Sequence, residues 1–426
     1  MSSTVDERPG IVAVVRARLA QIALASCAIY LALLPTPDGT FIRSWTFGLA
    51  SLCAILLALT ARNVGVPSTP SPGRAIVVTF GLWMTWSTAS WLWTIRPSYT
   101  LGQLEREVLQ TALIVFAFYV TCSDQRSFRL LAGVALSSFA FFAGLALGMA
   151  FSPFGWQPSH WHYDFGIWST YVVLIEPFIL LLLIPRPFGY ADGGRSYAVA
   201  ALMFALLIAT VRITDNRIVW LALGVVLLTA GAAIATRFRA MRGRAVIRWF
   251  LPIAIVLIGL SASFIDVARE RAARDGAAVG SLLGAFAADP RIALWERVGG
   301  KIESRPLLGY GFGRRILEQE LVPETQNQLM NHAHNLFLSA AIQSGLIGLA
   351  LFCAALVALV ANYVTFLRAA GDRELALLGI LGLALITGFV TKNLTDDFFY
   401  RSNAKEFYVL NAMVIGYGTR LKRRPR

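Results

Sequence analysis

Apolar runs long enough to cross a membrane recur from about residue 19 to about residue 420, and they constrain the fold more than any other feature. A helix needs roughly 20 apolar residues to cross a bilayer. Hydrophobic residues make up 57% of the chain, whereas charged residues make up only 15%. We therefore predict an all-α, polytopic membrane protein and set a water-soluble fold aside.

Hydropathy places twelve transmembrane helices, with ends defined to within several residues. Their expected ranges are 19–35, 45–61, 75–93, 108–122, 130–152, 165–185, 196–212, 217–235, 247–266, 334–368, 375–395 and 403–419. The chain then divides into residues 1–266 with nine helices, one helical loop subdomain at 267–333, and residues 334–426 with three helices.

The distribution of Lys and Arg predicts the orientation, because short cytoplasmic loops are rich in these residues. With the N-terminus inside, the cytoplasmic segments hold 21 of the 38 basic residues, and segment 267–333 holds 9. Both termini are therefore expected in the cytoplasm, with the loop subdomain outside. The net charge of +14 lies mainly at helix ends, where it meets anionic lipid, so we predict membrane lipids and no nucleic acid as partners.

The four cysteines, Cys27, Cys53, Cys122 and Cys353, are far apart and lie in or beside predicted helices. They indicate neither a disulfide framework nor a CxxC metal site. We expect them to be small core residues.

The outer loop is too short, at about 67 residues, for a nucleotide-sugar-binding domain of the usual size. The chain also contains no DxD motif, which disfavours a glycosyltransferase that uses a metal and a nucleotide sugar. Within the loop, Asp289 is a good N-cap and Pro290 a good first residue for a helix. Apolar side chains then recur at helical spacing, which predicts an amphipathic helix resting on the membrane; they are Ile292, Trp295, Val298 and Ile302.

The range 334–368 is too long for one straight span, because 35 residues make a helix of about 52 Å. Either the helix projects outward, or it breaks near Gln343, Ser344 and Gly345. In both cases His334 and Asn335 are expected at the outer surface.

Three polar groups at that outer face are candidates for chemistry: Arg217 with Arg212, Arg291, and His332 with His334 and Asn335. An arginine at the end of a span often only anchors the helix, and a histidine at a helix start often only caps it. The functional alternative is that arginine binds phosphate oxygens and that an imidazole, with a usual pKa near 6.5, takes a proton from a hydroxyl.

Other patterns leave further alternatives open. The chain has two histidine pairs, "HWH" at 160–162 and "HAH" at 332–334, which could together form a zinc-binding site. Neither pair has a familiar metal-binding spacing. Asp396 and Asp397 either orient a histidine or an acceptor hydroxyl, or form a solvated loop pair balanced by Lys392 and Arg401. The "GYGFG" run at 309–313 is on no βαβ unit, so we read it as a turn that allows close backbone approach and not as a dinucleotide site.

The run "RIALWERVGGKIESRPLLGYGFG", followed by "NHAHNLFLSAAIQSGLIGLALF", resembles the signature of the bacterial O-antigen ligase family. This family lies within the O-antigen ligase and polymerase superfamily. The conspicuous match covers about residues 289–350, with weaker agreement at the arginine of the eighth span, and the N-terminal half matches only in hydropathy.

The resemblance implies a GT-C-like glycosyltransferase of the bacterial inner membrane that needs no metal or other cofactor and has a periplasmic active site. Such enzymes transfer a glycan from undecaprenyl pyrophosphate to a sugar hydroxyl, which in the ligases belongs to the lipid A core. The family's catalytic residues resemble His334, Arg217 and Arg291, and its acidic position resembles Asp396 or Asp397. His332, Asn335 and Arg212 are expected to bind substrate.

This chemistry agrees with the residue types, since arginine stabilises the charge of a departing pyrophosphate while a base deprotonates the acceptor. Attack opposite the pyrophosphate inverts the anomeric centre. We favour a ligase over a polysaccharide polymerase, which uses another carrier-linked glycan as acceptor. Protein O-oligosaccharyltransferases also resemble this region, but they commonly carry a large soluble C-terminal part. A lipid-linked glycan transporter is the alternative of another class, although only Glu176, beside Pro177, is an ionisable residue expected deep in the membrane.

Overall fold

The computed structural model describes residues 11–36, 39–63, 70–152, 165–183, 194–214, 216–238, 254–259, 262, 290–326, 330–395 and 397–424. These residues are almost entirely helical and contain no strand. The first half of the chain forms α1 (Ile11–Leu33), α2 (Thr40–Asn63), α3 (Arg74–Ala89), η1 (Ser90–Leu92), α4 (Pro97–Gln103), η2 (Leu104–Leu109), α5 (Gln110–Thr121), α6 (Gln125–Ala150) and α8 (Phe165–Leu183). The second half forms α9 (Gly194–Thr214), α10 (Arg217–Arg237), α13 (Pro290–Ser304), α14 (Glu318–Thr325), α15 (Leu336–Leu367), α16 (Arg373–Lys392) and α17 (Arg401–Lys422).

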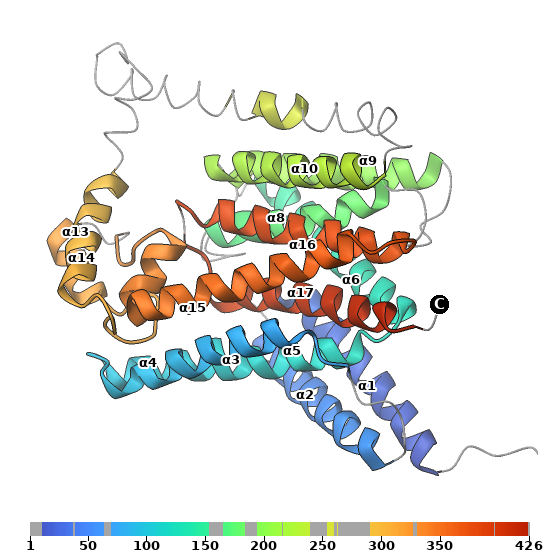
Figure 1. Ribbon diagram of the computed structural model, residues 1–426. Helices are drawn as coiled ribbons and strands as arrows, with labels where there is room; N and C mark the ends of the chain where they lie inside the picture. The colour runs from blue at the N-terminus through green and yellow to red at the C-terminus, as the bar shows by residue number, and fades with distance from the viewer. Residues whose placement is uncertain are drawn as a thin grey trace, which may run out of the picture.

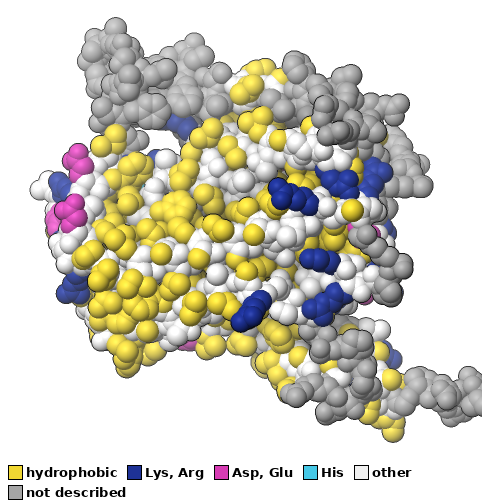
Figure 2. Space-filling view, viewed as in Figure 1, with side chains coloured by type: hydrophobic (Ala, Val, Ile, Leu, Met, Phe, Trp, Pro, Cys, Tyr) yellow, Lys and Arg dark blue, Asp and Glu magenta, His cyan; other side chains and the backbone are white. Residues whose placement is uncertain are grey.

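The all-α membrane fold is confirmed, since eight of the described helices are long and apolar enough to span a membrane. In Figure 1 α3, α10, α15, α16 and α17 run lengthwise across the molecule and α1 and α2 run obliquely to them, while α13 and α14 lie at one end and α17 finishes at the other. Figure 2 shows hydrophobic side chains over much of the visible helical surface and Lys and Arg gathered toward the end where α17 finishes. The expected span at 247–266 lies mostly outside the described residues, so the total of twelve stays a prediction.

The core of the bundle is formed where α8, α10, α16 and α17 pack together, and it contains large side chains such as Trp168, Phe178 and Phe389. Cys27, Cys53 and Cys122 are buried in this core, as expected for small core residues, whereas Cys353 is half-buried. The expectation that Glu176 is the only deeply placed ionisable residue is wrong. Glu406 of α17 is also buried, because most of α17 from Asn403 onward is packed inside the bundle.

Of the two alternatives for the long helix, the structure shows the break, which lies at Gly345, whose backbone has φ 67° and ψ −176°. The segment before α14 enters this break and forms hydrogen bonds with its open backbone groups. Tyr310 N–H donates to the Ile342 carbonyl at 2.8 Å, and Leu346 N–H donates to the Pro306 carbonyl at 2.7 Å. Non-helical backbone in a membrane protein must be paired inside the protein in this way.

The glycine run at 309–313 makes this close approach possible, as the sequence predicted. Gly309, Gly311 and Gly313 all have positive φ angles. A Cβ atom on Gly309 would lie only 2.5 Å from the Ile342 carbonyl oxygen, so a larger residue does not fit there. The run therefore connects the outer loop to the broken helix.

The helix expected after Asp289 is confirmed as α13, which begins at Pro290, while Asp289 itself lies outside the described residues. Its buried side chains are Leu294 and Val298, which pack in a small second core with residues of α14 and α15. Lys301 of α13 forms ion pairs with Glu320 and Glu324 of α14, with Nζ to oxygen distances of 2.5 and 3.0 Å. At least this face of the amphipathic helix is therefore covered by protein.

Candidate active site

The two histidines of the "HAH" motif lie in the short segment that leads into α15. Asn335 caps this helix, because its Oδ1 accepts hydrogen bonds from the N–H groups of Phe337 and Leu338 at 2.9 and 3.0 Å. Its Nδ2 donates to the Leu394 carbonyl at 2.7 Å, which fastens the segment to the end of α16. Asn335 therefore has a structural role, and its proposed contact with substrate stays a prediction.

His332 is buried, and both of its ring nitrogens have partners. Its Nε2 lies 2.5 Å from Nη2 of Arg314, and its Nδ1 lies 2.6 Å from Oδ1 of Asn331. A guanidinium group can only donate, so Nε2 must accept and Nδ1 must carry the proton. Burial, followed by the neighbouring basic side chains of Arg314, His334, Arg315 and Arg291, holds the pKa of His332 well below its usual range. This imidazole is neutral at neutral pH, and Arg314 occupies its lone pair.

His334 lies two residues further on and is half-buried. Its backbone is left-handed, with φ 49°, a conformation that non-glycine residues adopt rarely and mostly at functional sites or turns. Its ring centroid is 3.8 Å from that of His332. The hydrogen bond from Trp295 Nε1 to the Ala333 carbonyl, at 2.9 Å, ties the intervening residue to α13.

Arg314 is the arginine at the centre of the site, and it immediately follows the glycine run. Its side chain is only 8% exposed. The guanidinium carbon lies 4.1 Å from the ring centroid of Tyr400 and 5.0 Å from that of Phe398. Its Nε is 3.9 Å from Oδ2 of Asp397, too long for a hydrogen bond, and makes no hydrogen bond to any part of the chain that the structure describes. Arg314 is thus a buried cation with a donor still available.

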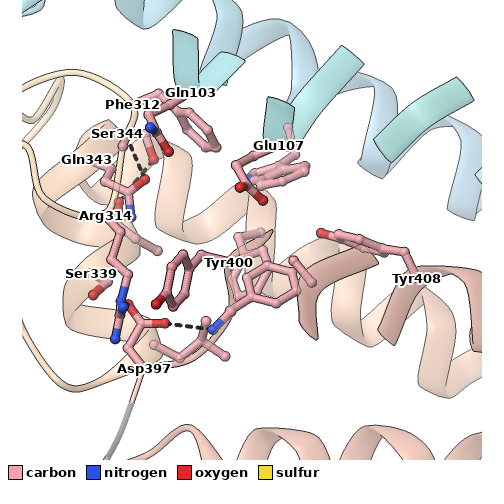
Figure 3. Close-up of a pocket in the computed structure, with 17 residues that line it drawn as sticks. Gln103, Glu107, Phe312, Arg314, Ser339, Gln343, Ser344, Asp397, Tyr400 and Tyr408 are labelled. Carbon is pink, nitrogen blue, oxygen red and sulfur yellow. Dashed lines mark hydrogen bonds and ion pairs between the residues drawn. The ribbon is translucent and has the colours of Figure 1, made fainter. Parts of the chain in front are cut away.

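A cavity of about 60 Å³ adjoins Arg314 and lies between η2, α15 and α17 (Figure 3). Its polar lining includes Arg314, Asp397, Ser339, Gln343, Gln103 and Glu107, and its aromatic lining includes Trp83, Phe312, Phe352, Phe399, Tyr400 and Tyr408. A ligand pocket usually measures about 300–1,000 Å³. The cavity therefore accepts only a small part of a ligand.

The structure brings together some of the residues predicted from the sequence. Asp397 lines the cavity, is 3% exposed and lies beside Arg314, so it is not a solvated loop residue. Arg291, in the first turn of α13, is half-buried and close enough for its charge to act on His332.

Other predicted residues lie elsewhere. Arg212 and Arg217 are exposed at the end of α9 and the start of α10, and neither lines the cavity. Asp396, His160 and His162 lie outside the described residues, so the zinc alternative is not tested.

Sequence reasoning missed Arg314, Tyr400 and Glu107. A signal for Arg314 was present, since it is the first charged residue after a glycine turn that was expected to approach other backbone closely. Tyr400 and Glu107 had no such signal, because each meets the site only through tertiary packing.

The model of the O-antigen ligase family matches residues 202–353, which run from α9 into α15. This stretch of the chain is therefore similar to the O-antigen ligase family. The matched range includes Arg314, His332 and His334, whereas Glu107 and Asp397 reach the cavity beside Arg314 from outside that range. A search of curated proteins found no match.

Proposed function

We propose that this protein transfers a glycan from undecaprenyl pyrophosphate to a sugar hydroxyl of the lipid A core, at the periplasmic face of the inner membrane. The observation that carries the proposal is the buried Arg314, held beside the paired histidines and the cavity. A buried guanidinium with a free donor is suited to phosphate oxygens, because its planar fork matches their geometry.

In the proposed reaction, the acceptor oxygen forms a bond to the anomeric carbon while the bond from that carbon to the pyrophosphate oxygen breaks. The electron pair leaves with the pyrophosphate, whose charge Arg314 and Arg291 stabilise, so no metal is needed. The proton of the acceptor hydroxyl passes to an imidazole. Attack from the face opposite the leaving group inverts the anomeric centre.

The hydrogen bonds of the two histidines support His334 as that base. Taking up a proton at His332 would require Nε2 to release Arg314 and would place a third charge beside Arg314 and Arg291. His332 instead orients Arg314 as a neutral acceptor. The part of Arg217 in this reaction stays a prediction, and an exposed arginine at the start of α10 is compatible with a contact to the lipid-linked donor outside the cavity.

The test is glycan transfer by the purified protein from an undecaprenyl-pyrophosphate glycan to rough lipopolysaccharide, with excess EDTA. Glycan-extended lipopolysaccharide is the expected product. Longer carrier-linked chains without lipopolysaccharide product would indicate a polymerase of the same superfamily. Movement of the donor across a vesicle membrane without any covalent transfer would indicate a transporter.

A further inference from the structure

The end of the cavity that the proposed reaction does not use carries Glu107. This residue lies in η2, a π-helical turn in which Gln110 N–H donates to the Glu105 carbonyl. Such turns are rare and are frequently found at functional sites. Figure 3 shows the Glu107 carboxylate on the far side of Tyr400 from Arg314. The two ends of the cavity therefore have opposite charge.

The Glu107 carboxylate is fixed in place but retains hydrogen-bonding capacity. Both of its oxygens lie 3.0 Å from the backbone nitrogen of Arg401, the first residue of α17. Burial raises the pKa of Glu107, whereas the positive charges of Lys405, Arg401 and Arg106 act to lower it. An ionised carboxylate has about four acceptor positions, so one N–H group leaves most of them available. What binds there must donate hydrogen bonds.

Two carboxamides line the cavity with Glu107. Gln103 lies one turn earlier on the same continuous helix, and Gln343 lies across the cavity on α15. The side-chain oxygen of Gln343, Oε1, accepts from Gly313 N–H at 2.9 Å. Its NH2 group makes no hydrogen bond within the part of the chain that the structure describes, so it is a donor available to a ligand.

The rest of this end is aromatic, with the rings of Trp83, Phe312 and Tyr408 among its walls. One acceptor-only group, carboxamides that both donate and accept, and flat apolar walls match a molecule with hydroxyls on its edge and C–H groups on its faces. A sugar ring has this chemistry. The volume of about 60 Å³ limits the fit to one edge of a single ring.

We propose that Glu107, with Gln103 and Gln343, forms a subsite for the hydroxyl groups of one sugar ring beside the Arg314 cation. The proposal rests on the proposed glycan transfer and adds to it the place where a sugar is recognised. The ring belongs either to the donor, as the sugar attached to the pyrophosphate, or to the acceptor, and the hydrogen-bonding chemistry is the same for both.

The variant Glu107→Gln tests this subsite. It keeps a carbonyl oxygen for Arg401 N–H but removes the charge and one acceptor, so the fold is expected to survive. Hydrogen bonds to charged groups are worth enough to lower kcat/KM by about ten- to a hundredfold, and the loss is expected in KM. Glu105→Gln is the matched control, because Glu105 is exposed on the same turn.

Transfer is measured with the donor varied at saturating rough lipopolysaccharide, and then with the acceptor varied at saturating undecaprenyl-pyrophosphate glycan. A higher KM for the donor assigns the ring to the donor, and a higher KM for the acceptor assigns it to the acceptor. If both KM values stay unchanged, the subsite is refuted. A fall in kcat alone also refutes it, because that result shows that Glu107 only positions Arg401.

A failure of the sugar subsite can be distinguished from a failure of the proposed glycan transfer. If the wild-type protein transfers no glycan, binding of the undecaprenyl-pyrophosphate glycan is followed through tryptophan fluorescence, since Trp83 lines the cavity. Weaker binding to Glu107→Gln than to the wild type would support the subsite without the transfer reaction. Equal binding, or no binding to either protein, would overturn it.

Discussion

Replacing each histidine of the "HAH" motif by glutamine and by alanine separates a base from an orienting residue. At position 332, alanine removes the acceptor of Arg314 and the donor to Asn331. A buried donor or acceptor left unpaired costs about 1–3 kcal/mol, so we expect His332→Ala to lose about 3 kcal/mol of stability as well as activity. Glutamine supplies both an acceptor and a donor, so His332→Gln is expected to recover most of both.

At position 334 the expected pattern is the reverse. His334 is half-buried, so His334→Ala should change stability by about 1 kcal/mol or less. General-base catalysis contributes about 10²- to 10⁴-fold, and the transfer rate should fall by this factor. Glutamine cannot take up the proton, so His334→Gln should be as slow as His334→Ala.

The assay is glycan transfer to rough lipopolysaccharide by the four purified variants, with thermal unfolding of each in the same detergent. A wild-type rate in His334→Gln would refute the base assignment. A folded His332→Gln that transfers no glycan would refute the orienting role, because it would show that the imidazole itself is required at 332.

Three further predictions concern the framework of the site. Gly345→Ala should destabilise the protein by about 3 kcal/mol or more, because the new Cβ would overlap the Leu307 carbonyl. Gly371 also has a positive φ but lies in open space, so Gly371→Ala should lower the stability by only about 1–2 kcal/mol. Thermal unfolding midpoints of the two variants test this difference. Asn335→Ala should lower the free energy of unfolding by about 2 kcal/mol, because it removes both the helix cap and the hydrogen bond to the end of α16. Asn335→Asp should restore the cap but not that hydrogen bond, so its unfolding midpoint should lie between those of Asn335→Ala and the wild type. Because the pKa of His332 is lowered in the folded protein, the unfolded chain binds the proton first as the pH falls below about 6.5. The contribution of His332 to the free energy of unfolding is therefore complete above that pH and declines below it by at most about 1.4 kcal/mol per pH unit. His332→Gln should flatten this pH dependence of stability, and an equally steep profile in the variant would contradict the prediction.

The sequence predicted the membrane fold and the start of α13, and it gave a break near Gly345 as one of two alternatives, because each depends on local pattern or length. It also predicted the neighbourhood of His332, His334 and Arg291, which lie within about 45 residues of one another in the outer loop region. Local pattern does not show which helices meet, so it gave no reason to select Glu107. That residue comes from η2 and reaches the cavity through its contact with Arg401, 294 positions later.

The two histidines illustrate the same limit at short range. They are identical in type and two positions apart, so the sequence could not rank them. Their difference arises from Arg314 and Asn331, which occupy both nitrogens of His332. The sequence likewise could not select Arg314 instead of Arg217 as the arginine of the cavity, because the position of Arg314 depends on how the glycine run packs against the break in α15.

The broken helix α15 also has a consequence for the order in which the protein is made. Every group that pairs with its open backbone precedes it in the chain: Trp86 Nε1 donates to the Ser344 carbonyl, Tyr310 N–H to Ile342, and the Pro306 carbonyl accepts from Leu346. Synthesis proceeds from the N-terminus, so α3 and the glycine run already exist when Gly345 leaves the ribosome. The bend can therefore form against a finished partner during membrane insertion, whereas the histidine segment is fastened only later, when Asn393 and Leu394 at the end of α16 accept the hydrogen bonds of Leu336 and Asn335.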